Sequence, residues 1–223
     1  MSYYPKALAL LYWAPALGYI AVAPMRPFIG SGLLKAAPIL LLLALCARQL
    51  QGQPRRLAML ALAFAACGDI ILDLGHHTHL LPGLCAFAIT QLAYIRLFAQ
   101  RPEGEFAFLA WTLPLGTAAF IWLISPFLFD TPQGHMFWPM AIYAALLTAM
   151  VMTVMHGARD RSVIFGAMLF LVSDSWIAID TFIWPSPWGL SGIWLSYYAA
   201  QWLLIQSLLQ SESTLAKPAI AVE

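Results

Sequence analysis

The most constraining feature of this chain is a series of eight apolar stretches, joined by short connections. The stretches cover residues 7–25, 31–47, 56–74, 80–99, 107–128, 136–155, 162–183 and 190–209. A membrane-spanning helix needs about 20 mostly apolar residues, and none of the stretches alternates with the period of two that a strand requires. Charged residues make up only 9% of the 223 residues, against about 25% in a soluble domain. The sequence therefore predicts an all-α, polytopic membrane protein with eight transmembrane helices in one bundle.

The domain organisation and the partners follow from the same composition. We expect residues 1–210 to form a single transmembrane domain and residues 211–223 to form a polar, disordered tail. The formal net charge of +1 excludes a nucleic-acid binder, and no obligatory protein partner is indicated. The expected surroundings are membrane lipid, in the inner (cytoplasmic) membrane if the source is bacterial. The odd number of cysteines, in or beside apolar stretches, predicts buried and unpaired side chains at Cys46, Cys67 and Cys85.

Positive charge predicts the orientation of the bundle, because Lys and Arg favour cytoplasmic connections. Seven of the eleven basic residues flank the connections after the second, fourth and sixth stretches: Arg48, Arg55, Arg56, Arg96, Arg101, Arg159 and Arg161. Lys6 and Lys217 fall on the same side, whereas Arg26 and Lys35 fall on the other. Both termini are therefore expected to be cytoplasmic.

Four of the ten acidic residues lie inside predicted spans, and all four are aspartates. A carboxylate in hydrocarbon costs several kcal/mol, so each is expected to face the bundle interior or a hydrated cavity. Counted along the helices, Asp69 and Asp174 lie about 20 and 18 Å from the inner boundary, and Asp73 and Asp180 both lie about 27 Å from it. We predict that Asp69 and Asp174 are catalytic and that Asp73 and Asp180 bind substrate. Asp180 has the alternative role of capping the outer end of its helix.

Further polar side chains are predicted near the level of these acids. Lys35 enters the second span from the outer side, where it could bind a phosphate or an aspartate, or extend to the interface. The remaining candidates for substrate binding are amides and phenols, which need partners when buried and could equally form a polar network in the core. They are Gln91 and Tyr94 on one face of the fourth span, Tyr143 in the sixth, and Tyr198 and Gln201 in the eighth.

Three histidines crowd the connection between the third and fourth spans, at His76, His77 and His79. Zinc ligands must converge tetrahedrally, which adjacent histidines in a short loop rarely do, and no Cys or Glu supports them. We therefore expect an exposed, pH-sensitive polar loop rather than a metal site. No metal ligand set and no cofactor are predicted elsewhere.

The two halves of the chain carry similar short motifs. Ala-Cys-Gly-Asp at 66–69 lies in the third of the first four spans, and Leu-Val-Ser-Asp at 171–174 lies in the third of the last four. Each is followed by a span that carries a glutamine, Gln91 or Gln201. A parallel repeat about an axis along the membrane normal would make the aspartates that end the two motifs face each other.

These motifs resemble the signatures of the YhhN family. Gly-Asp-Ile-Ile-Leu at 68–72 and Gly-Leu-Cys-Ala-Phe at 83–87, leading to Tyr94, look like the first signature. Ser-Asp-Ser-Trp-Ile-Ala at 173–178 and Tyr-Tyr-Ala-Ala-Gln at 197–201 look like the second. The similarity covers spans two to four and six to eight.

Some positions depart from the family pattern. Lys35 and Pro38 resemble its Lys-Pro element with two residues inserted, Gln91 stands where a histidine is common, and Asp180 stands where an asparagine is more usual. The resemblance implies an eight-helix membrane protein. It also implies the activity of the characterised members, which are lysoplasmalogenases. These enzymes hydrolyse the vinyl ether of a lysophospholipid, the lysoplasmalogen, to a fatty aldehyde and glycerophosphoethanolamine or glycerophosphocholine.

Paired aspartates suit this reaction on chemical grounds. Protonation of the alkene carbon of a vinyl ether gives an oxocarbenium ion, water adds, and the hemiacetal collapses to an aldehyde. One carboxyl must be protonated and one ionised, and two aspartates close together in a low-dielectric site divide in that way. We predict these roles for Asp69 and Asp174, and the sequence leaves open which of them is the acid. The chain has no Gly-x-Ser-x-Gly motif, which disfavours ester hydrolysis by a triad.

Two other classes of function would use the same residues. Intramembrane acids at matched depths also suit a proton-coupled transporter, and a lipid-binding membrane protein without turnover needs a similar cavity. Few Gly or Pro breaks lie beside the acids, which speaks against transport. Product formation in detergent, where no gradient exists, distinguishes an enzyme from a carrier.

Overall fold

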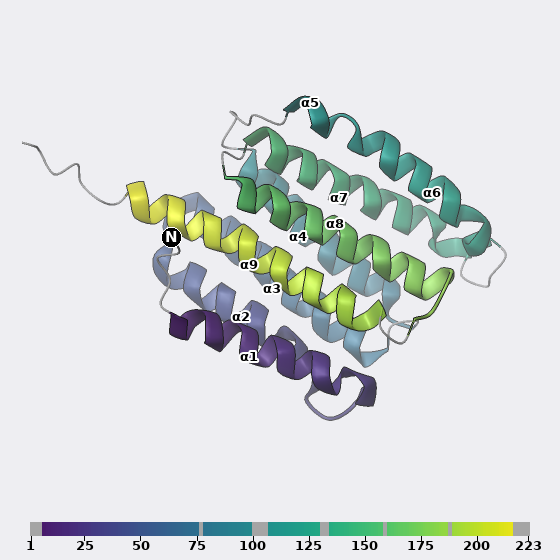
Figure 1. Cartoon of the computed structure of the whole chain (residues 1–223), viewed down its shortest axis with the longest axis horizontal. Coiled ribbons are helices and arrows are strands. Elements are labelled where there is room, and N and C mark those ends of the chain that lie inside the picture. Colours follow the sequence, from purple (N-terminus) through teal and green to yellow (C-terminus); the bar gives the residue numbers. More distant parts are fainter. Residues whose placement is uncertain are drawn as a thin grey trace, which may run out of the picture.

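The computed structural model describes residues 6–75, 78–99, 107–129, 134–157, 160–186 and 189–215. Within these ranges every regular element is a helix and no strand is present. The long helices lie side by side with roughly parallel axes, and the chain reverses direction from each to the next (Figure 1). The all-helical prediction is confirmed.

The helix boundaries follow the apolar stretches of the sequence closely. In chain order the helices are α1 (Lys6–Val22), α2 (Ser31–Gln49), α3 (Gly52–Leu74), α4 (Leu80–Phe98), α5 (Ala107–Ala110), α6 (Leu113–Phe129), α7 (Phe137–Gly157), α8 (Arg161–Phe182) and α9 (Gly189–Leu215). Two short 3₁₀ turns, η1 (Ala23–Met25) and η2 (Gly134–Met136), follow α1 and precede α7. The helix α9 continues past residue 209, and residues 216–223 of the expected tail lie outside the described residues.

Seven candidate membrane spans were found within the described residues, from the stretch that begins at Ala7 to the one that ends at Phe182. The helix α9 is not among them. It carries Tyr197, Tyr198 and Gln201, which lower its hydropathy and are all buried inside the bundle. The exterior is apolar instead, as the exposed Leu115 and Trp122 of α6 show. This inverted distribution of polarity is that of a protein surrounded by lipid.

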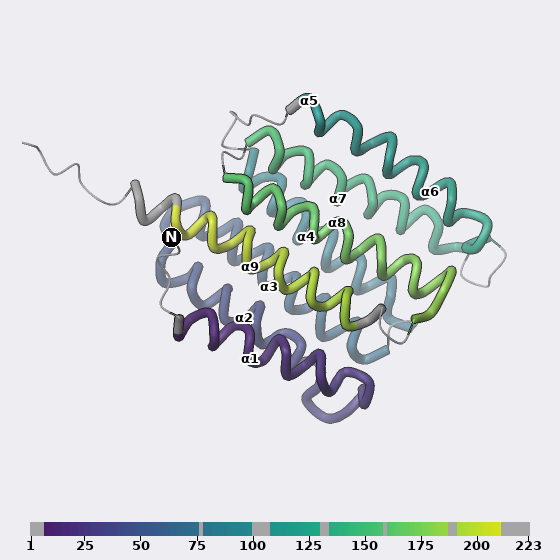
Figure 2. The backbone as a smooth tube through the Cα atoms, in the orientation of Figure 1, coloured from purple at the N-terminus to yellow at the C-terminus, as the bar shows by residue number. Residues whose placement is uncertain are grey.

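Six of the helices close a ring in the order α2, α3, α4, α7, α8 and α9, with α9 returning to α2. The helix α1 lies outside the ring against α2 and α9, and α6 lies outside it against α7 and α8. These two outer helices occupy opposite margins of the bundle (Figure 1). Following the chain in Figure 2 shows that its first and last helices become neighbours. The ring order agrees with the predicted parallel repeat, because it places α3 opposite α8.

A small residue before each of the two central aspartates lets the following helix approach closely. A Cβ atom at Gly68 would lie 2.7 Å from a ring carbon of Phe87 in α4, so a larger side chain would displace that ring. Ser173 holds the corresponding place in α8, and its hydroxyl donates a hydrogen bond of 3.1 Å to the carbonyl oxygen of Ile193 in α9. The motif pairs Gly-Asp and Ser-Asp thus serve helix packing as well as placing the acids.

The basic residues of the described chain gather at one end of the bundle, which we call the arginine end. It carries Arg48, Arg55, Arg56, Arg96 and Arg161. The helix α1 begins and α9 ends there (Figure 1). The opposite end carries Arg26 in the connection between α1 and α2. The other two arginines of the charge argument, at 101 and 159, lie outside the described residues.

The cysteine prediction is correct at one position and wrong at two. All three thiols are free, and Cys46 is buried, but Cys67 and Cys85 are exposed on the outer faces of α3 and α4. The reason is that a lipid-facing position and a core position are equally apolar in a membrane helix, so hydropathy does not separate them.

The start of α8 provides a test of local stability. Asp160 is the N-cap, and its carboxylate accepts hydrogen bonds from the Ser162 backbone N–H (2.9 Å) and from the Ser162 hydroxyl (2.6 Å). Partial desolvation opposes ionisation, but these bonds, together with one from the Ser207 side chain, outweigh it and hold the pKa of Asp160 below its ordinary value. Asp160→Ala is expected to lower the free energy of unfolding by about 1 kcal/mol. The difference from wild type should shrink as the pH falls through the lowered pKa. Thermal unfolding in detergent at two pH values checks this, and a difference independent of pH would contradict it.

Candidate active site

Asp69 of α3 is held by a donor on each of its oxygens. The ammonium nitrogen of Lys35 lies 3.4 Å from Oδ1, and the phenol of Tyr197 in α9 donates a hydrogen bond of 2.8 Å to Oδ2. Both charged side chains are almost fully buried. Of the three possibilities open to Lys35 in the sequence, the structure shows the aspartate partner. An ionised carboxylate accepts on both oxygens and donates on neither, so this environment suits the ionised form of Asp69.

A chain of hydrogen bonds leads from α4 through α9 to Asp69. The phenol of Tyr94 donates to Oε1 of Gln201 (2.5 Å), and Nε2 of Gln201 donates to the phenol oxygen of Tyr197 (3.4 Å). Tyr197 then donates to Asp69. Every donor in this chain points toward the carboxylate, and such aligned bonds polarise one another. Tyr94 and Gln201 therefore belong to a polar network in the core behind the site.

Tyr198, another predicted binding residue, ties helices together. Its phenol donates to the backbone carbonyl of Lys35 (2.9 Å), and its own carbonyl accepts from the phenol of Tyr12 in α1 (2.7 Å). It does not line the cavity described below.

Asp174 of α8 has a poorer set of donors. The phenol of Tyr143 in α7 donates a short hydrogen bond to Oδ2, and Nε2 of Gln91 in α4 lies 3.4 Å from the same phenol. Among the described residues no donor contacts Oδ1 of Asp174. The Oε1 atom of Gln91 is also buried without a partner in the described part of the chain. This second aspartate therefore keeps one oxygen available for a ligand.

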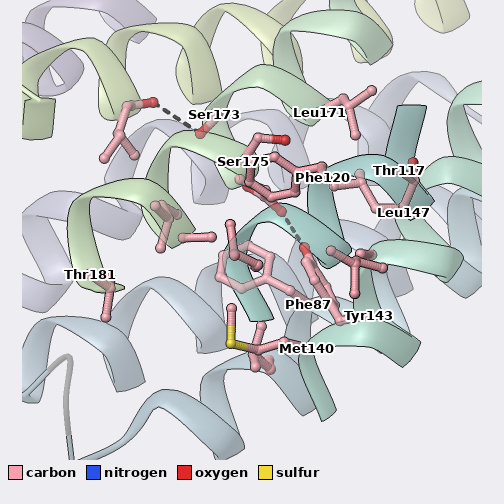
Figure 3. A pocket seen from close by; sticks show the side chains of 18 of the residues that line it. Phe87, Thr117, Phe120, Met140, Tyr143, Leu147, Leu171, Ser173, Ser175 and Thr181 are labelled. Atoms are coloured by element: carbon pink, nitrogen blue, oxygen red, sulfur yellow. Dashed lines mark hydrogen bonds between the residues drawn. The ribbon is translucent and has the colours of Figure 1, made fainter. Parts of the chain in front are cut away.

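Both aspartates line a single cavity of about 440 Å³, a size typical of small-molecule sites. Its polar lining includes Lys35, Tyr143, Ser173 and Tyr197 beside the two acids. The rest is largely apolar and extends between α6, α7 and α8. Figure 3 shows Tyr143 with the dashed hydrogen bond of its phenol, whose acceptor is Asp174. Thr117 and Phe120 of α6 line the same cavity with Leu147 and Leu171. The cavity thus joins a small polar end to a longer apolar arm.

The two outer aspartates lie away from this cavity. Asp73 accepts hydrogen bonds from the phenol of Tyr19 (2.5 Å) and from the hydroxyl of Ser31, which fastens α1 and α2 to the end of α3. Asp180 accepts from the backbone N–H of Ser186 (2.8 Å) and so holds the chain that leaves α8, the alternative given for it above. Of the ten predicted site residues, the cavity is lined by four: Lys35, Asp69, Tyr143 and Asp174.

The sequence analysis missed several residues of the site. Tyr197 donates directly to Asp69, and its position four residues before Gln201, on the same helix face, was an available signal. Phe87 and Trp194 line the cavity from α4 and α9. The lining residues of α6 had no signal in the sequence, because they are ordinary apolar residues of a span.

The histidine loop is described only in part. His79 lies with its Nδ1 atom 2.8 Å from the Thr78 hydroxyl and 3.3 Å from the Gly75 carbonyl oxygen. His76 and His77 lie outside the described residues. No cluster of three or more potential metal ligands was found in the portion of the chain that the structure describes.

Buried polar groups inside the ring, an apolar exterior and seven membrane-length helices define an integral, multi-pass membrane protein with an internal polar cavity. The YhhN family profile matches residues 31–208, which cover both aspartate motifs. The chain belongs to the YhhN family.

Relatives of the chain carry the name lysoplasmalogenase. Lysoplasmalogenase TMEM86B of Mus musculus is 32% identical over 213 residues, covering 93% of this chain and 90% of that protein. Lysoplasmalogenase TMEM86A of Bos taurus is 32% identical over 162 residues, covering 67% of this chain and 64% of that protein. The match with TMEM86A therefore spans less than two thirds of its length. No solved structure matches the chain.

The buried ion pair provides a test of the site's architecture. Lys35→Met removes the cation and leaves Asp69 buried with a single donor, which should cost about 3 to 5 kcal/mol of stability. Adding Asp69→Asn to the same chain should restore much of that loss, because the uncompensated charge disappears. Thermal unfolding in detergent measures both, with Arg48→Met at an exposed position as the control. Equal stability of the single and double variants would contradict the pairing.

Proposed function

We propose that this protein is a membrane-embedded hydrolase that cleaves the vinyl ether bond of lysoplasmalogens. The products are a fatty aldehyde and glycerophosphoethanolamine or glycerophosphocholine. The observation that carries the proposal is the placing of Asp69 and Asp174, with unequal sets of donors, on one cavity that continues into an apolar arm. The names of the relatives support the same substrate class.

The chemistry requires carboxyls in two different protonation states. A carboxylic acid protonates the alkene carbon of the vinyl ether, and the positive charge is shared between the neighbouring carbon and the ether oxygen. Water adds to this oxocarbenium ion and releases a proton. The resulting hemiacetal then breaks its bond to the glycerol oxygen, which gains a proton as the hemiacetal hydroxyl loses one to become the aldehyde oxygen. An ionised carboxylate stabilises the cation and accepts the proton of the attacking water, as in glycosidases.

The unequal donor sets support a division of these roles between the two aspartates. Asp69 receives an ammonium and a phenol, so it serves as the ionised carboxylate. Asp174 receives one phenol and keeps Oδ1 free of donors within the described structure, so it can carry a proton on that oxygen and serve as the acid. Two carboxyls whose environments differ in this way divide the acid and base functions between them. Tyr143 orients the acid and Tyr197 orients the base.

The apolar arm fits the alkenyl chain of the substrate. It follows α6 from Leu113 to Leu128, which corresponds to about 22 Å along a helix. Apolar side chains of α6, α7 and α8 form most of its wall. A single-chain lipid with its vinyl ether at the two acids would lay its tail along this arm.

The topology completes the proposal. We infer that α9 is an eighth span, because it packs against α8, α2 and α1 and buries Tyr197, Tyr198 and Gln201 inside the ring. The arginine end then faces the cytoplasm with both termini. On this view residues 1–210 form one transmembrane domain.

The acid pair is tested by removing each carboxyl charge in turn. Asp69→Asn and Asp174→Asn are each expected to lower aldehyde release from a lysoplasmalogen by about 10²- to 10⁴-fold. Asp180→Asn, an intramembrane aspartate away from the cavity, should retain activity. The measurement uses purified protein in detergent, with thermal unfolding to show that each variant is folded. Loss of activity in neither acid variant would contradict the site, and an inactive wild type would favour the transporter.

The apolar arm is tested by filling it. Gly116 lines the cavity from α6, and a Cβ atom added there meets no heavy atom within 4 Å. Gly116→Leu should therefore be accommodated and should lower kcat/KM for a long-chain lysoplasmalogen at least tenfold more than for a short-chain one. Gly18→Leu in α1, which also meets nothing within 4 Å and lies outside the cavity, is the matched control. Equal effects on both chain lengths would contradict this placement of the tail.

A further inference from the structure

Arg26 lies in the connection between α1 and α2, at the end of the bundle opposite the arginine end. Its guanidinium carbon lies 4.9 Å from the centroid of the Trp194 ring. Trp194 is itself almost fully buried and lines the cavity. A cation–π contact of this kind restrains the guanidinium while leaving its N–H groups available. Arg26 is thus held against the wall of the site although it belongs to a connection between helices.

The buried acids toward this end of the bundle already have partners. Asp69 is paired with Lys35, Asp73 accepts from Tyr19 and Ser31, and Asp180 accepts from Ser186. Among the described residues no carboxylate pairs with the guanidinium of Arg26. Its side chain is half-buried, so it carries a positive charge that is fixed in place and without an anionic partner in the described structure.

The two catalytic candidates lie closer to the Arg26 end of the bundle than to the arginine end, so the head group of a bound substrate is expected at the Arg26 end. Asp69 lies five residues before the end of α3 at Leu74, and Asp174 lies eight residues before the end of α8 at Phe182. These separations correspond to about 8 and 12 Å along a helix. The opposite, arginine end is farther from both acids. Lys35, the other cation near this end, is held by Asp69.

We propose that Arg26 binds the phosphate of the head group while the vinyl ether lies between Asp69 and Asp174. The proposal rests on the proposed function and adds the group that distinguishes a lysophospholipid from an uncharged alkenyl lipid. A guanidinium presents its donors in a planar fork that matches two phosphate oxygens, which an ammonium does not. The phosphate is the anion that the unpaired charge lacks, and the choline or ethanolamine beyond it lies toward water.

The test compares two substrates that differ in the phosphate. Arg26→Gln should raise KM for a lysoplasmalogen about 10- to 100-fold, as loss of a hydrogen-bonded charge predicts, with kcat nearly unchanged. It should leave both constants for the corresponding 1-alkenylglycerol, which has no phosphate, unchanged. Arg26→Lys should fall between wild type and Arg26→Gln. Arg48→Gln, an exposed arginine at the arginine end, should change neither substrate.

Two results would overturn the assignment. An equal loss on both substrates would mean that Arg26 acts only by supporting Trp194, and no loss on either would mean that it takes no part. Calorimetric binding of lysophosphatidylethanolamine and of monoacylglycerol in detergent makes the same comparison without turnover. An inactive wild type that still prefers the phospholipid, and loses that preference in Arg26→Gln, would overturn the proposed hydrolysis but not the phosphate site. Binding of both lipids unchanged by Arg26→Gln would overturn the phosphate site even if hydrolysis is observed.

Discussion

The ion pair between Lys35 and Asp69 is the interaction on which the interior depends. Both charges are buried where lipid surrounds the bundle, so neither is tolerable without the other. The pair joins α2 to α3, and Tyr197 extends it to α9, so three members of the ring meet at one carboxylate. The rest of the polar network, from Tyr94 through Gln201, supplies donors to the same point. The contacts of Asp69 with Lys35 and Tyr197 therefore both help to close the ring and favour the ionised form of this carboxyl.

The pseudo-symmetric order of the helices makes the difference between the two acids informative. The helices α3 and α8 present Asp69 and Asp174 to one cavity. Asp69 has a cation and a phenol as partners, whereas Asp174 has a phenol alone among the described residues. Two carboxyls in identical surroundings would share one proton, and neither would be the protonated one consistently. Here the surrounding side chains break the symmetry, and the unequal donors provide the physical basis for assigning an acid and a base.

The sequence was most informative where the physics of lipid leaves little choice. Runs of apolar residues located the helices, and the cost of a buried charge singled out Lys35, Asp69 and Asp174. It was least informative where two environments impose the same composition. Cys67 and Cys85 face outward although they are as apolar as core residues. The part of α6 that lines the cavity has the same composition as an ordinary membrane span. Sequence position alone also did not separate amides and phenols on the cavity from those behind it, because both kinds need hydrogen-bond partners.

The place of α9 in the chain has a consequence for how the protein is made. This helix is synthesised after α1 to α8, and its tyrosines and glutamine would be poorly matched to lipid if it entered alone. Their partners on α2, α3 and α4 are synthesised before it, so the growing bundle offers α9 the hydrogen bonds that the bilayer cannot. Until α9 arrives, Asp69 lacks Tyr197 and the ring has a gap between α8 and α2. A nascent chain therefore carries no finished site until α9 has been made and has joined the ring.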